Sequence, residues 1–159
     1  MLSDLSASAR RVQEALQEHG LDCQVVELPD STRTAPEAAA AIGCQVAQIV
    51  KSLVFRGRHT DRPILVIASG ANRVNEKRLG ELAGEPVEKA SADFVRERTG
   101  FAIGGVPPLG HAEPLLTFID QDLLRYDIVW AAAGTPHAVF RLTPSQLTRV
   151  AGGKVTPIT

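Results

Sequence analysis

The spacing of hydrophobic and polar residues predicts a chain of short helices and strands. Leu5, Ala9, Val12 and Leu16 recur at helical spacing, and Gly20 follows them as a C-terminal stop. Similar patterns and capping residues predict helices at residues 5–19, 35–42, 75–82, 91–100 and 143–150. Runs rich in β-branched residues predict strands at 23–28, 53–55, 64–68, 115–119, 128–132 and 138–142. A helical turn is expected at 46–50 and a short extended segment near Val87.

The order of these elements indicates the fold class. The run from Ile64 to Ala68 is almost wholly apolar, which is typical of a central strand covered on both faces. The strands are numerous and do not alternate strictly with helices. We therefore expect a mixed α/β (α+β) fold in which helices surround a central mixed β-sheet. The length of 159 residues, 44% of them hydrophobic, predicts a single domain over residues 1–159.

Charge and cysteine content narrow the possible functions. The net charge of −1 gives no general attraction to nucleic acid, so any RNA contact depends on local basic residues. Cys23 and Cys44 are isolated, which fits a reducing compartment and two small buried side chains. We find no signal-peptide pattern or membrane-spanning run and expect a cytoplasmic protein. The basic candidates are the loop 56–62, Arg73, Lys77 and Arg78, with a solvated surface as the default interpretation.

A loop rich in glycine and proline follows the fourth predicted helix. Gly104 and Gly105 can adopt positive φ and bring the backbone close to another group. Pro107 and Pro108 stiffen the loop, and Val106 is held extended because it precedes a proline. Backbone amides in such a loop could bind a carbonyl or a developing oxyanion. The same residues also make ordinary tight turns, so both interpretations stay open.

Lys51 is the strongest single candidate for a functional residue, because apolar residues flank it on both sides. It either extends along the surface to water or enters a polar pocket, where it can hold a phosphate or stabilise negative charge. His111 and His137 each follow a proline-containing turn, where surface hydrogen bonding and a site role are both possible. His19 and His59 are expected at the surface. No pattern indicates a metal site, a serine-hydrolase elbow or a complete P-loop.

Five segments match one known family in order and spacing: 48–55, 68–73, 89–91, 99–111 and 130–137. Through these five segments the chain resembles the YbaK and prolyl-tRNA-synthetase-associated editing family of free-standing aminoacyl-tRNA deacylases. The resemblance covers nearly the whole chain. It implies a mixed α/β domain without metal or cofactor that hydrolyses the ester between a mischarged amino acid and the acceptor end of tRNA.

The resemblance also implies the site residues. The family's important lysine falls on Lys51 and its GxxxP loop on Gly104 to Pro108. A histidine near the amino-acid pocket of alanine-specific members matches His137, whereas Ser52 stands where other members have Thr or Asn. The expected catalytic residues are Lys51, Gly104 and Gly105. The expected substrate-binding residues are Ser52, Val106, Pro107, Pro108, Gly134 and His137.

The expected substrate is tRNA for proline that carries a small amino acid such as alanine or 2-aminobutyrate, with cysteine, serine and threonine left open. An aminoacyl ester is already activated, so the enzyme needs to hold it and place a water rather than supply a strong nucleophile. Prolyl-tRNA synthetase is a candidate partner, and no membrane or DNA partner is expected. The alternative is a non-catalytic module that binds a tRNA end or nucleotide and partners a synthetase.

Overall fold

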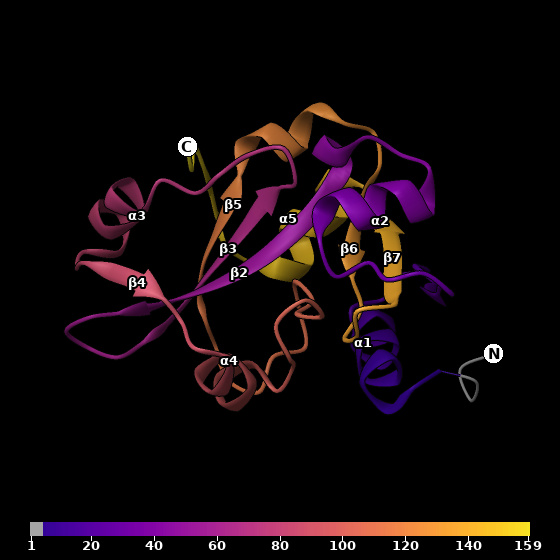
Figure 1. The fold of residues 1–159 in the computed structure, drawn as a ribbon, viewed down its shortest axis with the longest axis horizontal. Coiled ribbons are helices and arrows are strands. Elements are labelled where there is room, and N and C mark those ends of the chain that lie inside the picture. Colours follow the sequence, from indigo (N-terminus) through magenta and orange to yellow (C-terminus); the bar gives the residue numbers. More distant parts are fainter. Residues whose placement is uncertain (1–4) are drawn as a thin grey trace.

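The computed structural model describes residues 5–159 as one β-sheet flanked by helices (Figure 1). The helices are α1 (Ala7–Glu18), α2 (Ala35–Ile42), α3 (Glu76–Ala83), α4 (Ala92–Thr99) and α5 (Pro144–Ala151), with 3-10 turns η2 (Val46–Gln48) and η3 (Gln121–Arg125). The strands are β1 (Val25–Glu27), β2 (Ile49–Gly57), β3 (Pro63–Ser69), β4 (Val87–Lys89), β5 (Leu116–Asp120), β6 (Val129–Ala132), β7 (Ala138–Leu142) and β8 (Lys154–Thr156). None of the helices formed by these residues has the length and apolar character that a membrane crossing requires.

Local capping explains why the helices begin where the sequence predicted. The side chains of Thr34, Asn75, Ser91 and Thr143 each accept a hydrogen bond from a backbone N–H in the first turn of the helix that follows. These bonds satisfy amide groups that have no partner inside the helix. Helix starts are therefore encoded within four residues of sequence.

The sheet is mixed, as expected from the sequence. Its strand order is β1-β7-β6-β2-β3-β5-β8, and β4 also pairs with β2. β2 is antiparallel to β3 and parallel to β6, while β3 is parallel to β5. Every residue of β3 is buried, which confirms the predicted central strand.

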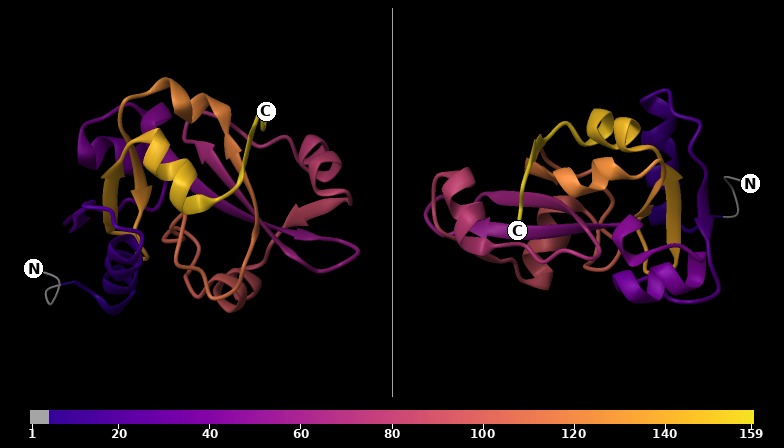
Figure 2. Two further views of the ribbon diagram at one scale, coloured as in Figure 1. Left: turned by 180° about the vertical axis from the view of Figure 1, so that it is seen from behind. Right: turned by 90° about the horizontal axis from the view of Figure 1, so that it is seen from above.

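Alternate residues of β3 pack on opposite faces of the sheet. Leu65 and Ile67 join the core formed with α1 and α5, whereas Ile64, Val66 and Ala68 join the core formed with α3. α5 lies behind the sheet in Figure 1 and in front of it in the left panel of Figure 2. Packing on both faces explains why β3 reads as a continuous apolar run.

β2 is longer than the sequence predicted. The expected helical turn at 46–50 ends at Gln48, and the strand expected at 53–55 already begins at Ile49. Pairing with β3 along most of β2 provides the hydrogen bonds that override the local helical preference. β8 and η3 were not predicted. β8 is three residues long and is defined by its parallel pairing with β5.

The sheet opens on one side of β2. β6 pairs with Ile49 and Val50, and β4 pairs with residues 55–57 of the same strand. Residues 51–54 have no strand partner on this side within the described part of the chain. A strand normally has neighbours on both sides in the middle of a sheet, so this gap leaves room for a ligand.

The two cysteines differ in burial. Cys23 is buried as expected, whereas Cys44 is only partly buried, and both are free thiols. Burial raises the pKa of both thiols, so neither is activated as a nucleophile.

Candidate active site

A cavity of about 640 Å³ lies beside the open part of β2. Lys51 and Ser52 of β2 line it, together with Trp130 of β6. Gly104 and Val106 contribute from the loop after α4. The volume lies within the usual range of small-molecule sites. Segments distant in sequence therefore meet around Lys51.

The structure decides between the two interpretations of Lys51. Its Nζ donates a hydrogen bond to the carbonyl oxygen of Asn72 at 2.7 Å, and its side chain is half-buried in the cavity wall. Burial lowers the pKa of the Lys51 ammonium, and the nearby charge of Asp120 opposes that shift. An ammonium has three N–H donors, so the bond to Asn72 leaves donors for a ligand.

Ser52 presents a second polar group at the same place. Its hydroxyl oxygen is buried and has no hydrogen-bond partner among residues 5–159. Buried polar groups are nearly always hydrogen-bonded, and each exception calls for an explanation. The Ser52 hydroxyl is such an exception, in a residue that lines the cavity.

Gly104 is placed against Arg33 at the cavity. Its φ is +91°, and a Cβ atom there would lie 2.8 Å from Cγ of Arg33. Both the left-handed backbone and the close approach require glycine. The N–H of Gly105 donates to the carbonyl oxygen of Ala102 at 3.0 Å, so this amide is engaged within the loop. The oxyanion role expected of Gly104 and Gly105 stays a prediction.

A neighbouring turn braces this loop from outside the cavity. Gly134 donates its N–H to the carbonyl oxygen of Gly105 at 2.8 Å. A Cβ on Gly105 would lie 2.8 Å from the Thr135 nitrogen, and one on Gly134 would lie 2.7 Å from the Ser8 carbonyl oxygen. The absence of a side chain on Gly134 therefore lets this turn pack directly against α1. His137 in the same turn is exposed, with Nδ1 at 3.2 Å from the carbonyl oxygen of Asp30.

The two prolines are buried behind the cavity wall. The Nε2 atom of His111 lies 2.7 Å from the carbonyl oxygen of Pro107, which identifies this nitrogen as the protonated one. Burial lowers the pKa of His111 and so favours the neutral imidazole, with its proton on Nε2. Pro108 and His111 line a separate cleft of about 400 Å³. Of the expected site residues, Lys51, Ser52, Gly104 and Val106 share the cavity, whereas Gly105, Pro107, Pro108, Gly134 and His137 do not line it.

The cavity is positively charged although the chain is not. Glu76 is the only acidic residue that lines it in the part of the chain described here. Its basic lining residues are Arg33, Lys51, Arg73 and Lys89. Sequence reasoning missed Arg33 and Lys89 as site residues because each is a single charge in a segment far from Lys51 along the chain.

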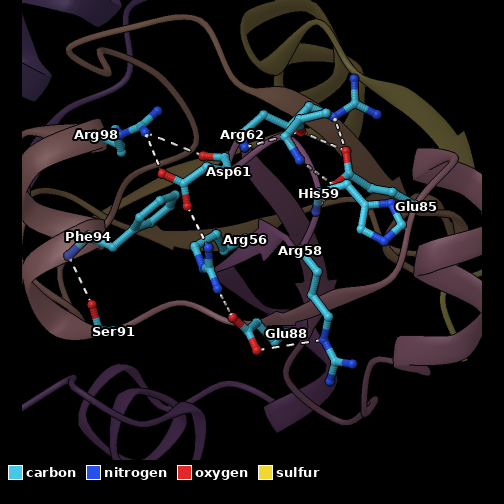
Figure 3. Close-up of polar contacts among 11 residues, drawn as sticks. Arg56, Arg58, His59, Asp61, Arg62, Glu85, Glu88, Ser91, Phe94 and Arg98 are labelled. Atoms are coloured by element: carbon cyan, nitrogen blue, oxygen red, sulfur yellow. Dashed lines mark hydrogen bonds and ion pairs between the residues drawn. The ribbon is translucent and has the colours of Figure 1, made fainter.

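The basic loop 56–62 has a different role. Arg56 forms ion pairs with Asp61 and Glu88, and Arg62 pairs with Glu85 (Figure 3). Further ion pairs link Arg58 to Glu88 and Arg98 to Asp61 and Glu113. Carboxylates pair with all of these arginines, whereas the basic residues that line the cavity form no ion pair among residues 5–159.

This mixed sheet, opening over a lysine-bearing cavity beside a glycine-proline loop, defines an α/β editing domain. Residues 29–150 match the family model of the aminoacyl-tRNA editing domain, and the chain belongs to that family. The family resemblance and the fold class drawn from the sequence are thereby confirmed. The chain is an enzyme of the aminoacyl-tRNA deacylase class, a hydrolase that acts on mischarged aminoacyl-tRNA.

Individual relatives agree with the family assignment. A solved structure described as a candidate trans-editing enzyme for prolyl-tRNA synthetase is 52% identical, with a TM-score of 0.92, over 98% of this chain and 99% of that one. The uncharacterised protein YwhH of Bacillus subtilis is 35% identical over 82% of this chain and 83% of its own length. EbsC of Enterococcus faecalis, described as a candidate Cys-tRNA(Pro)/Cys-tRNA(Cys) deacylase, is 24% identical over 79% of this chain and 77% of its own length.

Proposed function

We propose that this enzyme removes a small amino acid, alanine or 2-aminobutyrate, from mischarged tRNA for proline. The observation that carries the proposal is the cavity in which Lys51 and Gly104 meet among basic side chains. A terminal nucleotide brings phosphate to the basic residues, and the attached ester brings a carbonyl to Lys51 and Gly104. The similarity to a structure described as a trans-editing enzyme for prolyl-tRNA synthetase supports the choice of tRNA.

In this mechanism the enzyme positions the ester and stabilises the charge that develops on it. Lys51 donates to the terminal phosphate or to the ester carbonyl, whose oxygen becomes negative when water attacks. The amide of Gly104, in the loop that Gly134 braces through Gly105, provides the second side of that oxyanion site. The ester is activated already, so holding it against a positioned water supplies much of the rate.

The attacking water requires a base, and the substrate itself is the best candidate. Glu76 is the only carboxylate that lines the cavity within residues 5–159, and it lies at the start of α3 rather than on β2. The free α-amino group of the aminoacyl ester lies beside the carbonyl that reacts. It can accept the proton from water without help from a side chain.

The cavity wall favours a small amino-acid side chain. Ile49, Val106 and Ala131 make part of the wall apolar, which suits a side chain without a charge. One methylene in an apolar pocket discriminates by only about 1–3 kcal/mol, which is why synthetases benefit from a second hydrolytic sieve. Cysteine, the amino acid in the description of EbsC, is the nearest competitor to alanine and 2-aminobutyrate.

We also propose that residues 1–159 act as one editing domain that works in the cytoplasm with prolyl-tRNA synthetase as its source of substrate. The largest core cluster joins residues of α1, β1 and α5 to residues of the central sheet, which supports a single unit. Co-sedimentation of the enzyme with prolyl-tRNA synthetase, with and without tRNA, would test the partnership.

A panel of charged tRNAs tests the substrate. The tRNA for proline is charged separately with alanine, 2-aminobutyrate, cysteine, serine, threonine and proline, and ester loss is followed with wild type and with Lys51→Ala. We expect wild type to clear alanine or 2-aminobutyrate, spare proline and depend on Lys51. Equal clearance of proline, or full activity of Lys51→Ala, would contradict the proposal.

A further inference from the structure

A buried carboxylate is linked to Lys51 through Asn72. Asp120, the last residue of β5, is 1% exposed. Its Oδ2 accepts hydrogen bonds from Nδ2 of Asn72 at 2.8 Å and from the N–H of Ser69 at 3.0 Å, and its Oδ1 accepts from the N–H of Asp122 at 2.9 Å. The carbonyl oxygen of Asn72 accepts from Nζ of Lys51 at 2.7 Å. Asn72 therefore connects the Asp120 carboxylate to the Lys51 ammonium.

The sheet brings these residues together from three segments. β3 lies between β2 and β5 (Figure 1). Lys51 of β2 is opposite Ala68 of β3, and Ile67 of β3 is beside Ile119 of β5. Asn72 lies in the turn after β3, where its N–H donates to the carbonyl oxygen of Ser69 at 3.0 Å. The turn thus crosses between the Lys51 side chain and the end of β5.

The burial of Asp120 calls for an explanation. Removing a carboxylate from water is costly unless a partner compensates it. Asp120 forms no ion pair within the described residues, and N–H groups alone contact it. The cationic side chain on which its charge acts is Lys51, reached through Asn72. The carboxylate therefore satisfies local N–H groups, and its negative charge also acts on Lys51 at the cavity.

We propose that Asp120 and Asn72 are positioning residues for Lys51, because they fix the direction of its ammonium and support its positive charge. The bond to Asn72 holds one N–H of Lys51, and the other two are directed to the substrate. This inference rests on the proposed function of Lys51. The other charged residues that share the cavity with Lys51 are Arg33, Arg73, Glu76 and Lys89.

A titration of Lys51 tests the inference without any activity measurement. The chain has four lysines, Lys51, Lys77, Lys89 and Lys154. Labelling their Cε atoms with ¹³C therefore gives few NMR signals, and Lys51→Arg identifies the one of interest. Asp120 opposes the effect of burial, so Asp120→Asn is expected to lower the pKa of Lys51 further. An unchanged pKa in folded Asp120→Asn would overturn the inference.

Asp122→Asn is the matched control for that titration. Asp122 also accepts from Nδ2 of Asn72, at 2.8 Å, but it is partly exposed and pairs with Arg125 at 3.1 Å. Its charge is screened, so its removal is expected to leave the pKa of Lys51 near the wild-type value. An equal shift in both variants would mean that the whole turn, rather than the charge of Asp120, controls Lys51.

Kinetics supply the second test. In single-turnover deacylation near pH 7, Asp120→Asn and Asn72→Ala should each be slower by about 10- to 100-fold, the scale of a misplaced catalytic group. As pH is raised, the rate of Asp120→Asn relative to wild type should fall, because Lys51 of the variant loses its proton at a lower pH than Lys51 of wild type does. A ratio that stays constant with pH would indicate a merely structural effect.

Asp120→Asn, Asn72→Ala and Lys51→Met together distinguish a failure of this inference from a failure of the proposed function. If Asp120→Asn does not fold, Asn72→Ala alone tests the inference. This variant removes the side-chain hydrogen bond to Asp120 but keeps the backbone carbonyl that accepts from Lys51. Deacylation by Asn72→Ala at the wild-type rate would overturn the inference. Full activity of Lys51→Met would refute the proposed function itself. An inactive Lys51→Met beside fully active Asp120→Asn would refute only the positioning role.

Discussion

At the scale of single residues, Lys51 is a charged side chain whose charge is disfavoured by burial. Burial lowers the pKa of Lys51, so the folded protein holds the charged form less readily than the unfolded chain does. A side chain that is unfavourable for folding but retained in a cavity wall is typical of a functional site. Stability and activity should therefore respond to its removal in opposite ways.

The first prediction concerns Lys51→Met. Single-turnover deacylation should fall by about 10²- to 10³-fold, as when one oxyanion donor is lost, while the midpoint of thermal unfolding stays equal or rises. Rates are measured with mischarged tRNA, and unfolding is followed by circular dichroism. A strong loss of thermal stability would show that Lys51 is structural and that its activity effect is indirect.

The second prediction compares two glycines with the same backbone conformation. The φ angle is +91° at Gly104 and +86° at Gly43. A Cβ added to Gly104 would lie 2.8 Å from Cγ of Arg33, whereas one added to Gly43 would have no atom within 4 Å. Alanine should cost each position about 1–2 kcal/mol of unfolding free energy through left-handed strain. Only Gly104→Ala adds a steric contact at the cavity, so only it should lose deacylation activity beyond its effect on stability. Equal activity in the two variants would contradict this assignment.

At the scale of elements, Glu85 holds the hairpin between β2 and β3 against the end of α3. Its carboxylate accepts from the N–H groups of His59 and Thr60 and from the Thr60 hydroxyl, and it pairs with Arg62 (Figure 3). These hydrogen bonds, those of Thr60 first, lower the pKa of Glu85 to about 2. A Cβ on Gly57 would lie 2.5 Å from Oε1 of Glu85, so the clamp also requires glycine there.

The third prediction gives the pH dependence of this clamp. The folded pKa of Glu85 is depressed from 4.5, so its stabilising effect is complete above that pH and is lost as pH falls towards 2. Glu85→Gln should therefore unfold at lower urea concentration than wild type near pH 6, and the difference should shrink between pH 4.5 and 2. Glu81→Gln, an exposed change on α3, is the control. A difference that is constant with pH would rule out the carboxylate as its cause.

At the scale of the whole molecule, ion pairing decides where positive charge is available. The arginines of the hairpin are paired with carboxylates, and the cavity keeps Arg33, Arg73 and Lys89 around one acidic residue. A chain of net charge −1 can bind a polyanion only where its charges are separated in this way. We therefore expect the acceptor end of tRNA to bind at the cavity.

The fourth prediction tests this separation through the salt dependence of tRNA binding. Each phosphate contact that is lost should reduce the slope of log affinity against log salt by about 0.7–0.9. Combined alanine substitutions of Arg33, Arg73 and Lys89 should flatten the slope, whereas Arg58→Ala in the paired hairpin should leave it unchanged. Filter binding of tRNA across a salt series measures both. A stronger effect of Arg58→Ala would place the RNA surface on the hairpin instead.

Much of the fold was predictable because its signals are local. Thr34, Asn75, Ser91 and Thr143 cap the predicted helices, and the apolar run at 64–68 is the buried strand β3. Capping and periodicity act over a few residues, so the sequence alone is sufficient to predict them. The order of matching segments also predicted the family, which the comparisons confirmed.

Local sequence patterns were sufficient to predict the helices, the central strand and the family, and to single out Lys51 and Gly104 as candidates. The start of β2 at Ile49 and the contact of Arg33 with Gly104 became known from the fold. The fold also showed that Asp120 reaches Lys51 through Asn72. These features depend on strand register and on contacts between segments tens of residues apart, for which no local pattern of side chains carries a signal.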